Sequence, residues 1–96
     1  MNEIPKNETI VVWGSGAASK ALQEEVCTLR SDINIKFLVD SFTEDLNTKP
    51  KTILPSMITK EVQYIVIASM YANEINQVIK TLALHPDVIV LKFKYR

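Results

Sequence analysis

Short apolar runs, rich in β-branched residues, alternate with polar or turn-forming segments along the chain. The clearest cover residues 9–13, 33–40, 62–69 and 88–93, and a shorter run precedes Pro55. Apolar runs of this length, bounded by turn signals, are typical of strands buried within a sheet. The pattern therefore predicts four strands, a short additional strand before Pro55, and a brief helical turn after it.

Two longer segments repeat apolar residues at the spacing of an α-helix. In residues 17–30 the apolar face would comprise Ala18, Ala21, Leu22, Val26 and Leu29. In residues 71–82 it would comprise Tyr71, Ile75, Val78, Ile79 and Leu82. Ser69 or Asn73 could cap the second helix. Pro86 would end it, since the residue before a proline avoids helical angles.

The predicted order of elements is strand, helix, strand, short strand, strand, helix, strand. Buried strands that alternate with amphipathic helices favour parallel pairing through right-handed crossovers. The sequence thus predicts a small three-layer α/β domain of the Rossmann-like type, with a mostly parallel sheet of four or five strands in the order 3-2-1-4-5. Residues 1–8 would be a loose lead-in, and residues 9–96 a single domain, either whole or a fragment of a larger protein.

Charge and composition narrow the range of partners. The chain of 96 residues has 11 basic and 11 acidic residues, so no net field favours nucleic acid or an anionic membrane. One cysteine and one histidine allow no intramolecular disulfide and argue against a structural zinc site. Without an apolar run that could span a bilayer, or a secretory signal pattern at residues 1–8, a cytoplasmic protein without membrane insertion is expected.

The stretch "VVWGSGAASK", residues 11–20, carries the strongest functional signal, because it joins a strand to a helix through two glycines. Gly14 would permit a tight turn, and Gly16 would let the backbone N–H groups approach a phosphate closely. Ser15 and Ala17 complete this phosphate-binding turn. Ser19 stands where the dinucleotide fingerprint has a glycine or alanine. The alternative is a purely structural strand–helix turn that binds no ligand.

The remaining candidate site residues follow the second and fourth predicted strands. In a sheet of this order, ligands bind beyond the carboxyl ends of the strands, where the strand order reverses. Asp40 could hold a ribose hydroxyl pair, with Ser41 beside it, or it could simply begin a solvated turn. The other wall of the crevice would be formed by Ala68, Ser69 and Met70.

The sequence offers little for catalysis. Its one histidine follows the second predicted helix, near the end of the sheet opposite the glycine turn, and no general base is indicated in the crevice. Cys27 is expected to be a small buried hydrophobe, and Trp13 and Tyr71 to be core aromatics. If a ligand binds, binding would be the whole function of the domain.

The segments "IVVWGSGAASKALQEEV", "IKFLVDS", "ILPSMI" and "VQYIVIASMYANEI" together resemble a small Rossmann-type domain of bacterial surface-polysaccharide proteins. Similar domains stand at the N-terminus of sugar O- and N-acyltransferases, in epimerase/dehydratase-like proteins, and at the C-terminus of sugar C-methyltransferases. The resemblance, over about residues 9–93, implies a bound nucleotide-sugar or NAD(P), held by the residues named above. It also implies a catalytic partner domain, which this chain lacks.

Three other interpretations stay open. The domain could bind NAD(P) for an oxidoreductase or epimerase. It could be an interaction module with an empty crevice, forming a homodimer through an apolar face around the last strand. It also resembles the B components of phosphotransferase-system sugar transporters, but Trp13 stands where those proteins carry a phosphorylated cysteine, and tryptophan cannot accept a phosphoryl group.

Overall fold

The computed structural model describes residues 3–14, 16–59, 61–82, 84 and 87–93. Its elements, in chain order, are β1 (Thr9–Trp13), α1 (Ala17–Leu29), β2 (Asn34–Val39), β3 (Lys51–Ile53), the 3-10 turn η1 (Pro55–Met57), β4 (Tyr64–Ile67), α2 (Ala72–Thr81) and β5 (Ile89–Lys92). The predicted site residue Ser15 and the predicted helix-ending Pro86 lie outside the described residues. Within the described ranges, no helix is long and apolar enough to cross a membrane.

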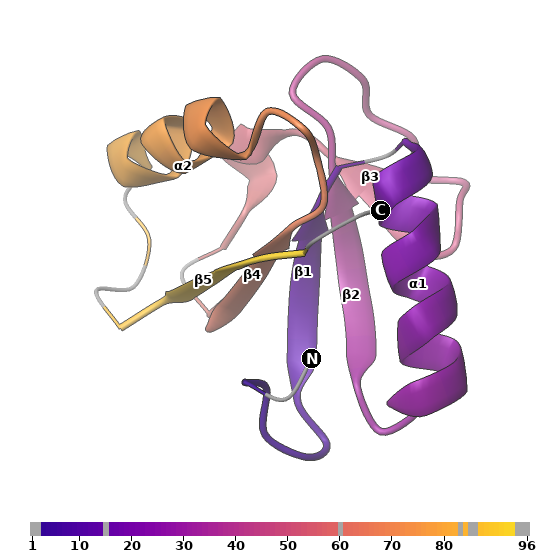
Figure 1. The fold of residues 1–96 in the computed structure, drawn as a ribbon. Helices are drawn as coiled ribbons and strands as arrows, with labels where there is room; N and C mark the ends of the chain where they lie inside the picture. Colours follow the sequence, from indigo (N-terminus) through magenta and orange to yellow (C-terminus); the bar gives the residue numbers. More distant parts are fainter. Residues whose placement is uncertain (1–2, 15, 60, 83, 85–86, 94–96) are drawn as a thin grey trace.

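The five strands form one sheet in the order β3-β2-β1-β4-β5, and every neighbouring pair is parallel (Figure 1). This confirms the predicted Rossmann-like α/β fold and strand order. The strands are shorter than predicted: β2, β4 and β5 each lose residues at both ends of the apolar run. The apolar runs exceed the paired strands because their ends also pack against the core, as Ile33 and Ala68 do.

Two apolar layers cover the sheet, one on each face. Ile10 and Val12 of β1 pack with α1, and Val11 and Trp13 pack with the face that carries α2. The alternation follows from the two-residue period of a strand. Figure 1 shows α1 alongside β1 and β2, with α2 near β4 and β5. The predicted three layers are present.

Several residues differ from their predicted burial. Leu29 is 71% exposed, Tyr71 is 61% exposed and Val78 of α2 is 41% exposed, although all three belong to predicted apolar faces. Leu29 is the last residue of α1 and Tyr71 directly precedes α2. Ser19, by contrast, is fully buried on the sheet-facing side of α1, and its hydroxyl accepts a hydrogen bond from Gln23 Nε2 (3.2 Å). Cys27 is exposed, so its predicted burial is wrong.

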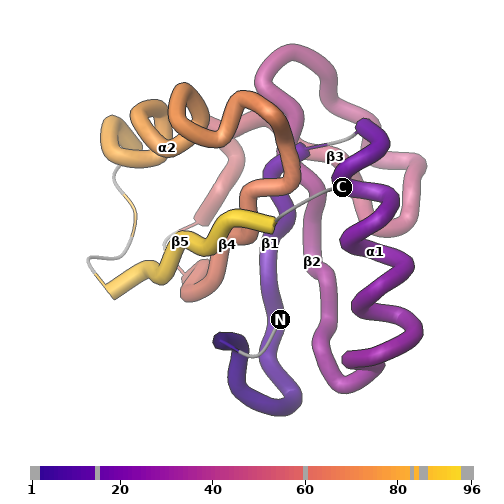
Figure 2. Tube along the Cα trace, in the orientation of Figure 1, coloured from indigo at the N-terminus to yellow at the C-terminus, as the bar shows by residue number. Residues whose placement is uncertain are grey.

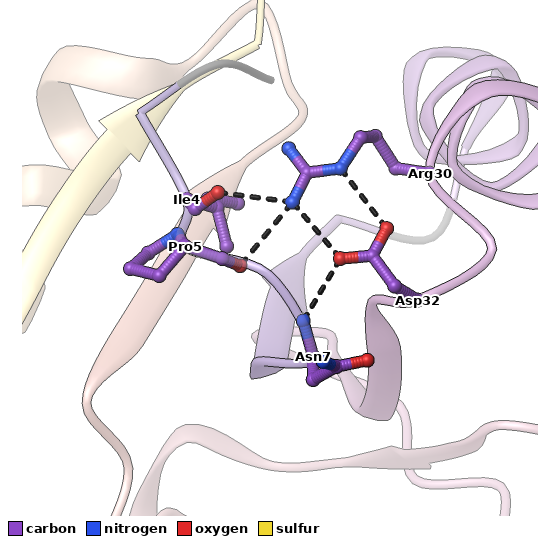
Figure 3. Close-up of polar contacts among 5 residues, drawn as sticks. All are labelled: Ile4, Pro5, Asn7, Arg30 and Asp32. Carbon is purple, nitrogen blue, oxygen red and sulfur yellow. Dashed lines mark hydrogen bonds and ion pairs between the residues drawn. The ribbon is translucent and has the colours of Figure 1, made fainter.

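The N-terminal segment packs against the domain, and the prediction of a loose lead-in is wrong at Ile4. Ile4 is only 2% exposed and lies in the α1-side core. The Arg30 Nη2 donates to the carbonyl oxygens of Ile4 (3.0 Å) and Pro5 (3.2 Å) (Figure 3). Asp32 accepts from the Asn7 backbone N–H (2.8 Å) and pairs with Arg30 Nε (3.0 Å). Arg30 and Asp32, which follow α1, thus hold the segment before β1 in place through hydrogen bonds.

The pair of Arg30 and Asp32 makes the stability of the fold depend on pH. The hydrogen bond from Arg30, with that from the Asn7 N–H, lowers the pKa of Asp32 from 3.8 to about 2. A carboxyl whose pKa falls on folding stabilises the fold above its unfolded pKa, and this contribution is lost as the pH drops from about 4 to about 2. We therefore expect Asp32→Asn to be less stable than wild type at pH 7, with the difference shrinking towards pH 2.

Urea midpoints measured from pH 7 to pH 2 would test this expectation. Glu24→Gln, on the exposed side of α1, is the matched control for the removal of a surface carboxylate. A wild-type-minus-Asp32→Asn difference that stays constant down to pH 2 would contradict the lowered pKa.

Candidate functional site

The described residues of the predicted site gather at the carboxyl edge of the sheet. Trp13 is in register with Val39 on one side and with Ile67 on the other. Gly14, Asp40 and Ala68 are the next residues on three adjacent parallel strands. Neighbouring strands lie about 4.8 Å apart, so these positions form one short row. The row lies where the strand order reverses, the usual ligand position in such sheets.

Gly14 is needed for the turn itself. Its φ is +141°, a backbone conformation that residues with a Cβ rarely adopt. A Cβ at this position would overlap the carbonyl oxygen of Ala68. Its N–H donates to the carbonyl of Val39 (2.8 Å). Gly14 thus lets β1 and β4 approach closely, and its N–H is engaged within the sheet.

Gly16 differs from Gly14 both in its backbone angles and in the space around it. It is the N-cap of α1 with extended backbone angles, and apart from its chain neighbours no atom of the described residues lies within 4 Å of where a Cβ would stand. No side chain of the described residues caps this helix end, and its first turn contains no acidic residue. The first N–H groups of a helix have no partner within the helix, and together with the helix dipole they attract anions. The open approach at Gly16 is therefore suited to a phosphate.

Asp40 is held in a turn at the end of β2. Its Oδ1 accepts the backbone N–H groups of Phe42 (2.8 Å) and Thr43 (3.0 Å). Its own N–H donates to the carbonyl of Ile53 (3.0 Å). The turn alternative for Asp40 is thus confirmed, and a ribose contact stays a prediction. Ser41 beside it is exposed.

The segment after β4 presents only part of the predicted wall. Ala68 is 2% exposed, and its N–H donates to Trp13 O (3.0 Å), so its side chain belongs to the core. The Ser69 hydroxyl accepts the backbone N–H of Tyr71 (3.1 Å), which closes the turn ahead of α2. Neither Ser69 nor Asn73 caps the helix through its side chain. Met70 is 86% exposed at this edge.

Two features of this edge escaped the sequence-based prediction. Phe42 follows β2 and is 92% exposed, so it and Met70 present apolar side chains on either side of the β1 turn. A cleft of about 380 Å³ lies between α1 and the connection from β2 to β3, and Lys20 and Asp40 both line it. The polar composition of residues 41–50 indicated a loop but carried no sign that it bends beside α1.

Trp13 is a core residue, as predicted. It is 1% exposed, and its indole N–H has no acceptor among the described residues. It is the only tryptophan of the chain, so its fluorescence reports on the core directly behind the glycine turn.

The arrangement defines a small Rossmann-like domain with an open helix N-terminus at the reversal point of its sheet. No model of a known protein family, no curated protein and no solved structure matches the chain. The resemblance to polysaccharide-biosynthesis domains therefore stays a prediction from the residues that carry it.

Proposed function

We propose that this domain binds a nucleotide, with a nucleotide-sugar as the preferred ligand, at the carboxyl edge of the sheet. The observation that carries the proposal is the start of α1. Its uncapped N–H groups, the open space at Gly16 and the absence of acidic residues from the first turn suit a diphosphate. NAD(P), which carries the same pyrophosphate, is the alternative ligand.

Apolar side chains beside the turn support a ligand with a flat ring. Phe42, Met70 and Tyr71 are all largely exposed, and they follow the two strands that flank β1. Exposed apolar residues gathered at one edge mark binding surfaces more often than chance placement, and aromatic rings stack readily on bases. Asp40, at the same edge, is the proposed ribose contact.

The proposal assigns binding and no chemistry to this domain. Catalysis would come from a partner domain or protein, in the sugar-nucleotide and surface-polysaccharide metabolism that the sequence resemblance implies. The test begins with a thermal-shift screen of NAD, NADP and the UDP-, GDP-, CDP- and dTDP-sugars, because a ligand that binds only the folded state raises its melting temperature.

Gly16→Val is expected to abolish the shift given by the active nucleotide. The valine side chain would occupy the open space through which a phosphate approaches the N–H groups of α1. The variant should still fold, because no atom of the described chain stands within 4 Å of the new Cβ. The measurement is the affinity of each variant for that nucleotide, with circular dichroism to verify folding.

Thr28→Val is the matched control, since Thr28 is exposed in the last turn of the same helix, far from the glycine turn. It should bind as wild type does. A folded Gly16→Val protein that binds the nucleotide with wild-type affinity would rule out the turn as the phosphate site.

An interaction module is the second candidate, favoured by the edge of the sheet at β5. Among the described residues this strand pairs only with β4, and Ile89 is 44% exposed on it. An unpaired edge with apolar side chains can pair with another chain. A screen without any shift, together with a dimeric mass in sedimentation equilibrium, would favour this candidate over nucleotide binding.

A further inference from the structure

The two outer strands of the sheet, β3 and β5, differ in how their outer sides are covered. β3 is short, and the backbone of Asp45 lies along it: Asp45 and Thr52 exchange hydrogen bonds of 2.9 and 2.8 Å. β5 has no such cover among the described residues and pairs only with β4. In Figure 2, β5 lies on the side of β1 opposite β2 and α1. Within the described chain, the sheet thus has one closed edge and one open edge.

The backbone of β5 directs alternate residues towards β4 and away from it. The N–H groups of Ile89 and Phe93 donate to the carbonyl oxygens of Gln63 (2.8 Å) and Ile67 (2.9 Å). Since successive residues of a strand point their backbone groups to opposite sides, those of Val90 and Lys92 face outward. No strand of the described residues lies there to pair with them. Such a row of backbone donors and acceptors is a template for a further strand.

The side chains of β5 make this edge apolar on the face of the sheet that carries α1. Leu91 and Phe93 are half-buried and pack against the α1-side core. Ile89 stands two residues before Leu91, so it belongs to the same face, and it is 44% exposed. The apolar row therefore lies at the margin of the core, where a neighbouring strand would extend it.

Lys92 is the only charged residue of β5, and its position leaves room for a partner strand. A lysine on an edge strand usually discourages pairing, because its ammonium group stands in the path of another strand. Here Lys92 Nζ donates to Asn73 Oδ1 (3.1 Å) in the first turn of α2. The charge is thus held beside α2, on the face opposite the apolar row.

A second copy of this chain fits the open edge in a closed arrangement. Pairing of β5 with β3 of another copy would continue into a filament, but Asp45 already occupies the outer side of β3. Pairing of β5 with β5 has two-fold symmetry and ends after two copies. The chain has 11 basic and 11 acidic residues, so net charge does not drive two copies apart.

The outward-facing residues restrict the register of such a pair. Residues that exchange hydrogen bonds across antiparallel strands must both face the partner, as Val90 does. A two-fold axis at Val90 places Val88 opposite Lys92 of the second copy, and Ile89 opposite its Leu91. An axis at Lys92 would instead bring two ammonium groups together, which is unfavourable. The register centred on Val90 joins the two apolar rows and opposes no like charges.

We propose that the chain forms a homodimer in which β5 pairs antiparallel with β5 of a second copy, centred on Val90. The two five-stranded sheets then become one continuous sheet. The proposal does not rest on nucleotide binding, because the outer side of β5 is separate from the start of α1. It gives the open edge a definite partner and a definite register.

Mass and amide exchange together test the dimer. Sedimentation equilibrium from micromolar to millimolar protein measures the mass, and NMR measures hydrogen exchange at the same concentrations. We expect the amides of Val90 and Lys92 to be protected in the dimer and to lose protection on dilution. The amide of Ile89, which donates to Gln63, should stay protected throughout. In a mixture of labelled and unlabelled chains, an NOE between Ile89 and Leu91 Hα protons checks the register.

Val90→Pro is the variant that should separate the dimer from the fold. It removes an N–H group that faces away from β4, and its ring stands in the path of a partner strand. We expect the dimer Kd to rise at least about tenfold, since both hydrogen bonds on the axis are lost. Circular dichroism should remain that of wild type. Val90→Ala, the matched control, keeps the N–H and should change the Kd less than about threefold.

The other outcomes count against the dimer or against the nucleotide proposal separately. A monomeric mass at millimolar concentration, or a dimer whose Val90 amide exchanges freely, overturns the β5 dimer and leaves nucleotide binding standing. A folded Val90→Pro protein that dimerises as wild type does also overturns it. If this variant does not fold, amide exchange and the NOE in wild type decide the question. A protected dimer that no nucleotide stabilises supports the dimer and overturns the nucleotide proposal.

Discussion

Gly14→Ala is expected to lower the free energy of unfolding by roughly 3–5 kcal/mol. Alanine strongly disfavours a φ of +141°, and its Cβ would overlap the carbonyl oxygen of Ala68. That oxygen belongs to the backbone of the segment after β4, so relief requires β1 and β4 to separate. Domains of this size have only about 5–15 kcal/mol in total, so much of the stability would be lost.

Gly16→Ala is the matched control, two residues away. Its φ is −94° and its surroundings are open, so we expect a change of no more than about 1 kcal/mol. Urea unfolding followed by Trp13 fluorescence measures both variants in one assay, because this tryptophan is buried and single. Equal stability of the two variants would show that the chain does not pass Ala68 as closely as described.

Ile4→Ala is expected to cost roughly 2–4 kcal/mol, as large-to-small changes in a core do. Ile4 is 2% exposed and packs into the α1-side core, and Arg30 hydrogen-bonds to its carbonyl. Removing its side chain leaves a cavity that the tethered backbone cannot readily close. A loose N-terminal segment would instead predict almost no effect, so this variant separates the two descriptions of residues 3–8.

Ile89→Ala is the control for this change, since Ile89 has the same side chain but is 44% exposed at the edge strand β5. It should cost less than half as much as Ile4→Ala. The measurement is again the urea midpoint, with the slope checked for two-state behaviour. If Ile89→Ala proves as costly as Ile4→Ala, Ile4 is not part of the core.

The apolar pattern was informative wherever burial on one face decides the structure. The run at 9–13 became β1 with the same bounds, and the segment 17–30 became α1 to within one residue. The alternation of strands and helices was enough for the strand order, because right-handed crossovers leave few topologies. The pattern was less accurate for single helix positions: Leu29 and Tyr71 at helix ends and Val78 within α2 are exposed.

The candidate site was also predictable from the sequence in part only. The glycine turn, Asp40 and the segment after β4 could be placed at one edge, because parallel strands end on the same side. Which glycine is sterically required could not, since the answer depends on Ala68, 54 residues further along the chain by position number. The burial of Ala68 and the exposure of Phe42 likewise depend on contacts between segments distant in sequence.

By itself, the sequence determined the class of fold, the order of its strands and the edge of the sheet at which the described candidate residues gather, because hydrophobic periodicity and chain connectivity are local properties. Only the tertiary structure decided that Ile4 completes the core, that Gly14 serves the sheet while Gly16 stays open, and that the β2–β3 connection forms a cleft beside α1. Each of these follows from contacts across many residues, for which no pattern of neighbouring side chains leaves a signal.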